Sequence, residues 1–282
     1  MEGRIIKGIG GFYYIKTSDK TIYECKARGK FRKDGITPTV GDVVETDGKS
    51  IDKIYERKSM LVRPSVANID NLIIVIAAKN PSPDLFLVDK LTVSAECAGI
   101  EPVICINKSD LSDCDEILSI YKNIGYKVFV MSAKEKTGAE ELRTVMYKKI
   151  SAFAGLSGVG KSSIINLLCD DSVETGETSR INRGRHTTRH VELYEVDDDS
   201  YILDTPGFSS LEISQICDID ASKLWQYFPE FQTDTPCRFK GCSHITEPDC
   251  AVLDKLSRGS ISKSRYESYV KLYEQLKNKK EW

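Results

Sequence analysis

The stretch Gly155-Leu-Ser-Gly-Val-Gly-Lys161-Ser162 decides the fold of this chain. It follows a short apolar stretch, residues 152–154, and opens a helical one, residues 163–168. A glycine-rich turn between a strand and a helix lets backbone N–H groups close around phosphate oxygens, and the helix N-terminus adds partial positive charge. Lys161 is suited to reach the β- and γ-phosphates, and the Ser162 hydroxyl is suited to ligate Mg²⁺. The stretch predicts a nucleotide-binding α/β domain.

A second motif, Asn107-Lys-Ser-Asp110, indicates that the base is guanine. A carboxylate at Asp110 accepts hydrogen bonds from N1–H and from the exocyclic amine of guanine, whereas adenine would leave it unpaired. The Lys108 stem can lie along the base, and Asn107 can tie loops together. In the companion motif Ser132-Ala-Lys134, the N–H of Ala133 can donate to the guanine carbonyl oxygen. An ATPase is therefore disfavoured.

The order of these motifs is unusual, because an ordinary GTPase has its phosphate loop first and its guanine motif later. Here the base-reading half precedes the phosphate-reading half, which is a rotation of the whole set rather than one chance match. The predicted GTP-binding residues are Asn107, Lys108, Ser109, Asp110, Ser132, Ala133, Lys134, Gly155, Leu156, Ser157, Gly158, Val159, Gly160, Lys161, Ser162 and Ser163.

Two further segments are predicted to sense the γ-phosphate. Asp204-Thr-Pro-Gly207 follows the apolar residues 201–203, so that Asp204 can serve the metal directly or through water and Gly207 can offer its N–H. The polar residues 180–190 lie between the phosphate loop and this motif, and either Thr187 or Thr188 would complete Mg²⁺ coordination. The predicted Mg²⁺ ligands are Ser162, Thr188 and Asp204. The alternative is that residues 180–190 form a basic loop that only touches RNA.

The position after Gly207 is Phe208, where many GTPases carry a glutamine that orients the attacking water. A phenyl ring cannot hydrogen-bond water in this way, so slow intrinsic hydrolysis is expected unless another group or a partner orders the water. His186 is the internal candidate, and the competing interpretation is that it contacts RNA. The predicted catalytic residues are His186, Thr187, Thr188 and Gly207.

A cysteine and histidine cluster near the C-terminus predicts one structural Zn²⁺. Cys237, Cys242, His244 and Cys250 supply three thiolates and one imidazole, a complete tetrahedral set that leaves no open position for catalysis. A zinc-dependent hydrolase is therefore disfavoured. Nine cysteines in all, scattered and odd in number, favour a metal over disulfides.

The chain divides by pattern into three predicted domains. Residues 1–66 contain short alternating stretches broken by turn residues, typical of an all-β barrel or sandwich. Residues 67–213 alternate strands and helices, which predicts a parallel sheet with helices on both faces. Residues 214–282 lack long strands and are predicted to be mostly helical. A helical stripe there, from Tyr266 to Leu276, is expected to pack on its own domain.

The charge distribution points to a polyanionic partner. Residues 1–66 carry 14 basic against nine acidic side chains, although the whole chain has a net charge of −2. The longest apolar run, Leu72 to Ala78, is too short to span a bilayer, and the N-terminus has no apolar signal core. A cytoplasmic protein without a membrane partner is expected.

With these motifs together, the chain resembles the circularly permuted, ribosome small-subunit-dependent GTPases of bacteria, the RsgA/YjeQ/YloQ type. The resemblance covers nearly the whole length and rests on residues 63–70, 107–110, 155–163, 184–188, 204–208 and the cysteine and histidine cluster. Two residues depart from it. Leu156 stands where relatives often have a polar residue, and Arg189 stands where a third threonine is common.

The resemblance implies an N-terminal OB-fold barrel, a central permuted GTPase domain and a C-terminal zinc domain. It also implies hydrolysis of GTP to GDP, stimulated by the small (30S) ribosomal subunit and its rRNA during late assembly of that subunit. We expect a monomer. An RNA-binding module that merely holds GTP remains the alternative, kept open by Phe208.

Overall fold

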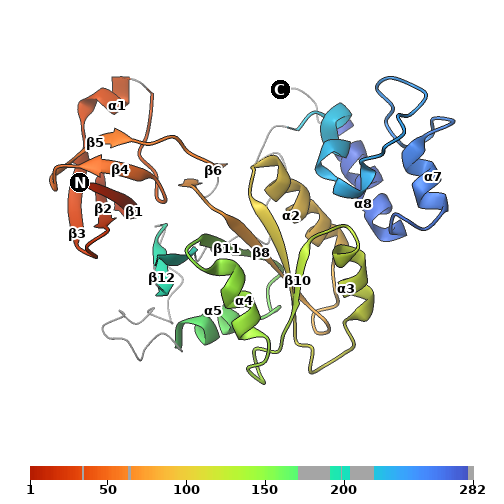
Figure 1. Ribbon diagram of the computed structural model, residues 1–282, viewed down its shortest axis with the longest axis horizontal. Coiled ribbons are helices and arrows are strands. Elements are labelled where there is room, and N and C mark those ends of the chain that lie inside the picture. Colours follow the sequence, from red (N-terminus) through yellow and green to blue (C-terminus); the bar gives the residue numbers. More distant parts are fainter. Residues whose placement is uncertain (34, 63–64, 171–190, 198, 204–218, 279–282) are drawn as a thin grey trace.

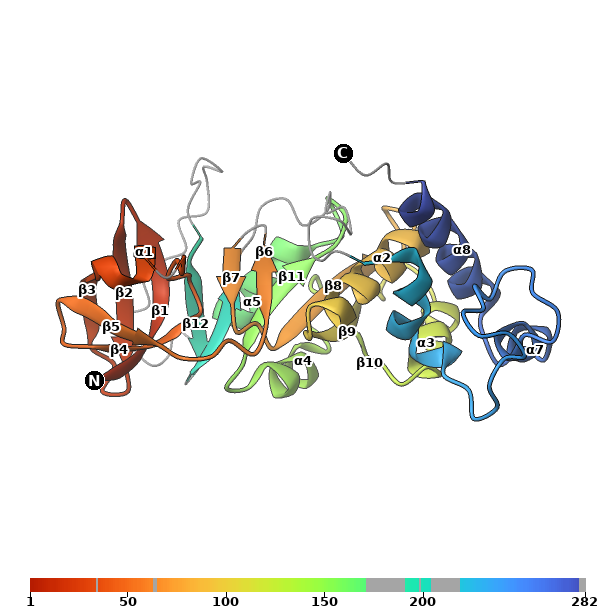
Figure 2. The same ribbon diagram turned by 90° about the horizontal axis from the view of Figure 1, so that it is seen from above.

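The computed structural model describes residues 1–282 except 34, 63–64, 171–190, 198, 204–218 and 279–282. Three parts lie in a row, with a barrel at one end, an α/β sheet in the middle and a helical C-terminal part at the other end (Figures 1 and 2). The predicted fold class is confirmed. The predicted residues His186, Thr187, Thr188, Asp204, Gly207 and Phe208 lie outside the described residues.

The N-terminal part is a closed barrel with the strand order β1-β2-β3-β5-β4. Strands β3 and β5 pair in parallel, and the other neighbours are antiparallel. Each strand turns one fully buried side chain inward, and these are Ile5, Ile15, Cys25, Val44 and Ile51. The elements are β1 (Glu2–Ile9), β2 (Phe12–Thr17), β3 (Ile22–Ala27), α1 (Gly29–Lys33), β4 (Val43–Thr46) and β5 (Ser50–Ile54).

The central part is a six-stranded sheet with the order β10-β9-β8-β11-β13-β12. The expectation of a parallel sheet holds for five strands and is wrong for β12, which pairs antiparallel with β13 as an edge hairpin. The strands are β8 (Asn71–Ala77), β9 (Glu101–Asn107), β10 (Lys127–Val130), β11 (Ile150–Ala154), β12 (Leu193–Asp197) and β13 (Ser200–Leu203).

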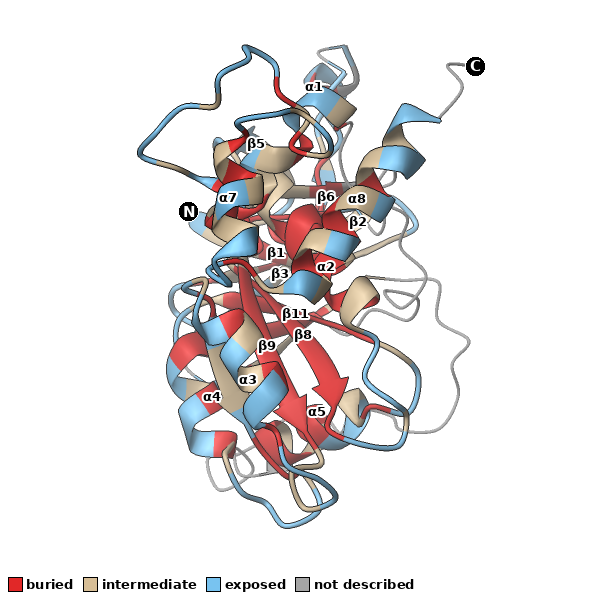
Figure 3. Cartoon of the chain, turned by 90° about the vertical axis from the view of Figure 1, so that its right-hand side faces the viewer, coloured by how far each residue is buried: buried red, intermediate tan, exposed pale blue. Residues whose placement is uncertain are grey.

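Helices cover both faces of the sheet, and the inner strands are buried along their length (Figure 3). On β8, Ile74 and Ile76 belong to the apolar cluster under α2 (Leu85–Cys97) and α3 (Asp115–Lys122). The alternate residues Ile73 and Val75 belong to the cluster under α4 (Ala139–Met146) and α5 (Lys161–Asp170). This two-sided burial explains why β8 reads as one continuous apolar run.

The barrel and the sheet are joined at a polar hinge. Arg57 donates from Nε and Nη2 to the buried Asp42 carboxylate at 2.7 and 2.8 Å. Asn68 donates to the carbonyl oxygen of Gly41 at 3.0 Å. A Cβ on Gly41 would lie 1.9 Å from the carbonyl oxygen of Ala67, so this close approach requires glycine. The hairpin of β6 (Met60–Val62) and β7 (Ser65–Ala67) lies at this hinge.

A second contact joins the barrel to the edge hairpin of the sheet. Lys7 of β1 pairs with Glu192 at 2.9 Å, and Lys16 of β2 pairs with Glu195 of β12. Lys16 is largely buried, with 9% of its side chain exposed. Part of the basic charge of the barrel is therefore paired with acidic residues of the central part.

The C-terminal part comprises η3 (Ala221–Tyr227), η4 (Pro229–Phe231), α7 (Ala251–Ser257) and α8 (Lys263–Lys277). As expected, α8 buries Tyr269 and Leu272 in the core of its own part. The same helix also packs against α2 of the central part, a contact that the sequence pattern did not predict (Figure 1). Among the described residues, every helix is too short or too polar to cross a membrane.

Candidate nucleotide and metal sites

The phosphate loop connects the end of β11 to the start of α5 at Lys161. Its backbone is closely packed at two glycines. A Cβ on Gly155 would lie 2.2 Å from the carbonyl oxygen of Val75, and a Cβ on Gly160 would lie 2.3 Å from Asn107 Nδ2. Both have positive φ, 138° and 100°. The glycines therefore allow the loop backbone to pack closely against its neighbours, as the motif requires.

Lys161 places its ammonium group within this loop. Its Nζ donates to the carbonyl oxygens of Gly155 at 2.8 Å and of Leu156 at 2.7 Å. Ser162 and Ser163 are exposed in the first turn of α5. A cation, exposed hydroxyls and a helix N-terminus thus meet at one place, and this donor set fits the phosphates of a nucleotide and Mg²⁺.

Asn107, at the end of β9, links the base-reading and phosphate-reading motifs. Its Nδ2 donates to the carbonyl oxygen of Val159 at 2.8 Å. Its Oδ1 accepts from the backbone N–H of Ala133 at 3.0 Å. Asn107 is only 1% exposed, so its bond to Val159 is shielded from water, whereas its bond to the half-buried Ala133 is only partly shielded. The structure thus brings together three motifs that are separated in the sequence, and the loop-tying role predicted for Asn107 has a geometric basis.

Asp110 presents a preorganised carboxylate beside these loops. The Ser132 hydroxyl donates to its Oδ1 at 2.6 Å, and Lys134 lies 3.7 Å from its other oxygen. The hydrogen bond from Ser132 lowers the pKa of Asp110, so the group is an acceptor-only carboxylate at neutral pH. A guanine edge needs such an acceptor, so these contacts favour the predicted specificity.

The ammonium group of Lys108 contacts two loops, a role that was not predicted from the sequence. Its Nζ donates to the carbonyl oxygen of Gly158 at 2.7 Å and to that of Asn80. The side chain thus bridges the phosphate loop and the loop before α2. The aliphatic stem of Lys108 can still lie along a base, while its ammonium group hydrogen-bonds to both loops.

The C-terminal cluster has the geometry of a closed metal site. The donor atoms of Cys237, Cys242, His244 and Cys250 all lie within 4.8 Å of one another. His244 Nδ1 is 3.6 Å from Cys237 Sγ and 3.4 Å from Cys250 Sγ, and the two sulfurs are 3.9 Å apart. Tetrahedral zinc, with Zn–S of about 2.3 Å and Zn–N of about 2.0 Å, places its ligand atoms roughly 3.5–3.8 Å apart. The residues therefore fit Zn²⁺.

Burial shifts the pKa values of His244 and Cys242 in the metal-ligand cluster. It lowers the pKa of His244, which keeps the imidazole neutral, and it raises the pKa of Cys242 to about 12. A buried thiol of this kind ionises when a metal compensates the charge. The loop is held from outside by Tyr269, which donates to the carbonyl oxygen of Ser243 at 2.7 Å, and by Tyr266, which donates to that of His244 at 3.0 Å.

A buried ionic network that was not predicted from the sequence joins the central and C-terminal parts. Arg265 of α8 is 0% exposed and lies between Asp89 of α2 and Glu230 of η4. The signal was present, because Arg265 shares one helical face with Tyr269 and Leu272 at spacings of four and seven residues. A charged residue in an apolar stripe indicates a buried partner.

The fold and these contacts define a class: a P-loop protein for guanine nucleotides with its base-recognition half placed first, between a barrel and a metal-binding part. Comparison with known proteins agrees. The family described as RsgA GTPase matches residues 54–214, and the one described as RsgA N-terminal domain matches residues 2–53. The chain belongs to the RsgA GTPase family.

Similar proteins support this assignment along the whole chain. The small ribosomal subunit biogenesis GTPase RsgA of Caldanaerobacter subterraneus is 48% identical, with 99% of this chain and 97% of the relative covered. The relative of the same name from Agathobacter rectalis is 44% identical, with both chains fully covered. The structure of YjeQ from Thermotoga maritima superposes with a TM-score of 0.85 at 36% identity, covering 99% of each chain. The structure of YloQ, a circularly permuted GTPase, superposes with a TM-score of 0.83 at 34% identity, covering 100% of this chain and 96% of the YloQ chain.

Proposed function

We propose that this chain hydrolyses GTP to GDP and phosphate when it binds the small ribosomal subunit, and that it acts in late maturation of that subunit in the cytoplasm. The observation that supports this most directly is the Asn107 link, which ties the phosphate loop to the loop of Ala133, where Ser132 holds the Asp110 carboxylate. The names of the relatives supply the subunit.

In this proposal each side chain has a limited task. Asp110 would select guanine, and the N–H of Ala133 would be shared between Asn107 Oδ1 and the guanine carbonyl oxygen in a three-centre bond. Lys161 would exchange its loop carbonyls for phosphate oxygens. Mg²⁺, held by Ser162 with Thr188 and Asp204, would neutralise charge on the phosphates. Gly207 would contact the γ-phosphate, and either Thr187 or Thr188 would complete the switch. His186, or a group of the ribosome, would orient the water that Phe208 cannot.

The three predicted domains would divide this work, with boundaries at 1–66, 67–213 and 214–282. The barrel, with its excess of basic residues, would contact rRNA. A structural Zn²⁺ on Cys237, Cys242, His244 and Cys250 would hold the C-terminal part together.

The test is GTP turnover by the purified full chain, alone, with small subunits, and with large subunits as a control. Strong stimulation by small subunits alone is expected. Binding to small subunits without stimulation would refute the triggered hydrolase and favour an RNA-binding module that only holds GTP. His186→Ala should lower the stimulated turnover. Unchanged turnover would show that another group orients the attacking water.

A further inference from the structure

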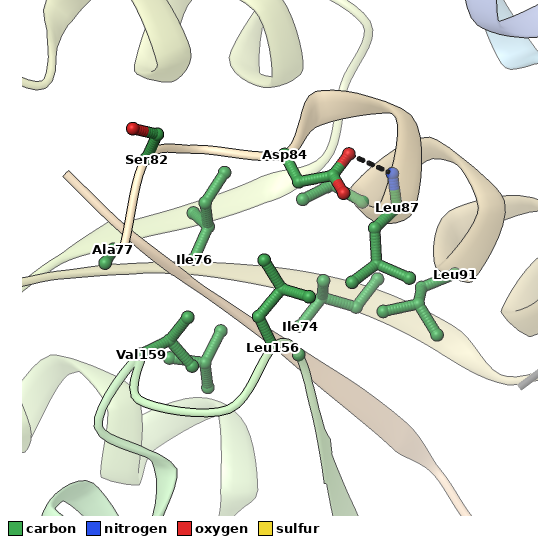
Figure 4. A pocket seen from close by; sticks show the side chains of 12 residues that line it. Ile74, Ile76, Ala77, Ser82, Asp84, Leu87, Leu91, Leu156 and Val159 are labelled. Carbon is green, nitrogen blue, oxygen red and sulfur yellow. Dashed lines mark hydrogen bonds between the residues drawn. The ribbon is translucent and has the colours of Figure 1, made fainter. Parts of the chain in front are cut away.

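Helix α2 lies between the phosphate loop and the C-terminal part. On one side, Leu87, Val88 and Leu91 line an apolar crevice above β8, and Leu156 of the phosphate loop enters this crevice from the other side (Figure 4). Leu156 is the residue at which the loop departs from the family resemblance, and here its side chain packs against both apolar clusters of the sheet.

The crevice is almost full. Its free volume is about 10 Å³, which is room for about one water molecule. It is therefore a packing contact and not a ligand site. Because close-packed apolar groups transmit displacement, a change in the position of Leu156 must be accommodated by α2 or by the sheet.

A second contact fixes the start of α2 to the same loop. The carbonyl oxygens of Asn80, before the helix, and of Gly158, in the phosphate loop, both accept from Lys108 Nζ. Asp84 then caps the helix by accepting from the N–H of Leu87 at 3.0 Å. The phosphate loop is thus joined to α2 by one apolar and one polar contact.

The opposite side of α2 holds the C-terminal part. Arg265 Nη1 donates to Asp89 Oδ1 at 2.9 Å and to Thr92 Oγ1 at 3.1 Å. The same guanidinium donates to Glu230 at 2.8 and 3.2 Å. Asp89, Thr92 and Arg265 are all 0% exposed. Pulling these groups apart would leave buried charges unpaired, so α2 and α8 should move as one body.

We propose that α2 couples the phosphate loop to the C-terminal part, with Leu156 as the contact on the loop side and Arg265 as the contact on the C-terminal side. The proposal rests on the nucleotide-binding role of the loop. A diphosphate that orders the loop then orders α2 and α8, and by reciprocity the C-terminal part supports nucleotide binding.

The test is amide hydrogen exchange of the full chain with and without saturating GDP, in parallel with calorimetric titration of GDP. GDP is the informative ligand because it lacks the γ-phosphate that Gly207 would contact. In the wild type, GDP should slow exchange in α2 and α8 by roughly 2- to 30-fold. Leu156→Ala should weaken GDP binding and should reduce the effect on α8 by at least half, measured at GDP concentrations that the titration shows to saturate the variant. Thr92→Val, which removes one bond to Arg265 and keeps the charges paired, should weaken it.

The matched control is Leu118→Ala on α3, which removes the same side chain from the same side of the sheet without touching the loop or α2 crevice. It should leave the GDP effect on α8 intact. The proposal is overturned if GDP leaves α8 unchanged in the wild type, if the effect is undiminished in Leu156→Ala, or if Leu118→Ala reduces it equally. Failure of GDP to bind at all would refute the nucleotide site itself, and the titration shows this separately.

Discussion

Asn107→Ala tests whether the two halves of the nucleotide site are held together by one side chain. The change removes the bonds to Val159 and Ala133, at 2.8 and 3.0 Å. Leaving a buried polar group unpaired costs about 1–3 kcal/mol. Val159 is buried, and Ala133 is half-buried and can recruit water, so we expect one full and one partial penalty. The free energy of unfolding should fall by about 2–4 kcal/mol.

The effect on nucleotide binding should exceed this general loss of stability, because both loops must be ordered to contact the ligand. We expect GDP affinity to fall about 10- to 100-fold, or about 1.4–2.8 kcal/mol. The control is Asn71→Ala at the opposite end of the sheet. Asn71 is 0% exposed and donates to the carbonyl oxygen of Val145 at 2.9 Å and to Ser151 Oγ at 3.2 Å.

Urea unfolding followed by circular dichroism, with titration of a fluorescent GDP analogue, separates the two effects. Both variants should lose similar stability, and only Asn107→Ala should lose affinity. Equal loss of affinity in the two variants would refute the bridge and reduce Asn107 to an ordinary buried amide. Full retention of affinity in Asn107→Ala would refute it as well.

Three further outcomes are expected. Ser132→Ala removes the hydrogen bond that lowers the pKa of Asp110, so the Asp110 carboxylate should become protonated at a higher pH than in the wild type. As the pH is lowered, the variant should therefore lose GDP affinity before the wild type does, and GDP titrations over a pH series would measure this. Cys237→Ser should release the metal and unfold the C-terminal part, seen as loss of bound zinc by metal analysis together with loss of helical circular dichroism. Arg265→Met should destabilise the chain by about 3–5 kcal/mol in urea, since it leaves two buried carboxylates unpaired. The exposed pair of Arg238 with Asp249 is the comparison, and Arg238→Met should cost under about 1 kcal/mol.

The sequence was most informative where a local pattern has one chemical explanation. The phosphate loop at Gly155, the carboxylate at Asp110 and the cluster at Cys237 each require particular atoms at particular spacings, and short-range geometry determines them. Helix ends depend on the neighbouring elements as well, and α4 ends at Met146. The chain becomes extended at Tyr147, because β11 must begin at Ile150.

The contacts between the three parts were not predictable in this way. The pairing of Lys16 with Glu195 joins residues 179 apart in sequence, and that of Arg265 with Asp89 joins residues 176 apart. Lys16, Glu195 and Asp89 each look like solvated surface charges in the sequence. The apolar stripe around Arg265 indicates a buried partner, but the local pattern does not identify that partner. The edge strand β12 was missed for a related reason. Its pairing with β13 follows from the sheet and not from its own short sequence.

The rotated motif order has a structural consequence that joins these observations. In this arrangement the chain leaves the barrel at the hinge of Asn68 and enters the central strand β8 directly. It leaves β8 beside the phosphate loop and continues into α2, which holds the C-terminal part through Asp89. One continuous strand–loop–helix unit therefore contacts the barrel hinge, the nucleotide site and the metal-binding part in succession. In the ordinary motif order the phosphate loop comes first, so the barrel would lead into β11. The strand β8 and the helix α2 would then no longer connect the barrel to the C-terminal part. The permutation thus places β8, a seven-residue strand that is buried at every position, where both outer parts depend on it.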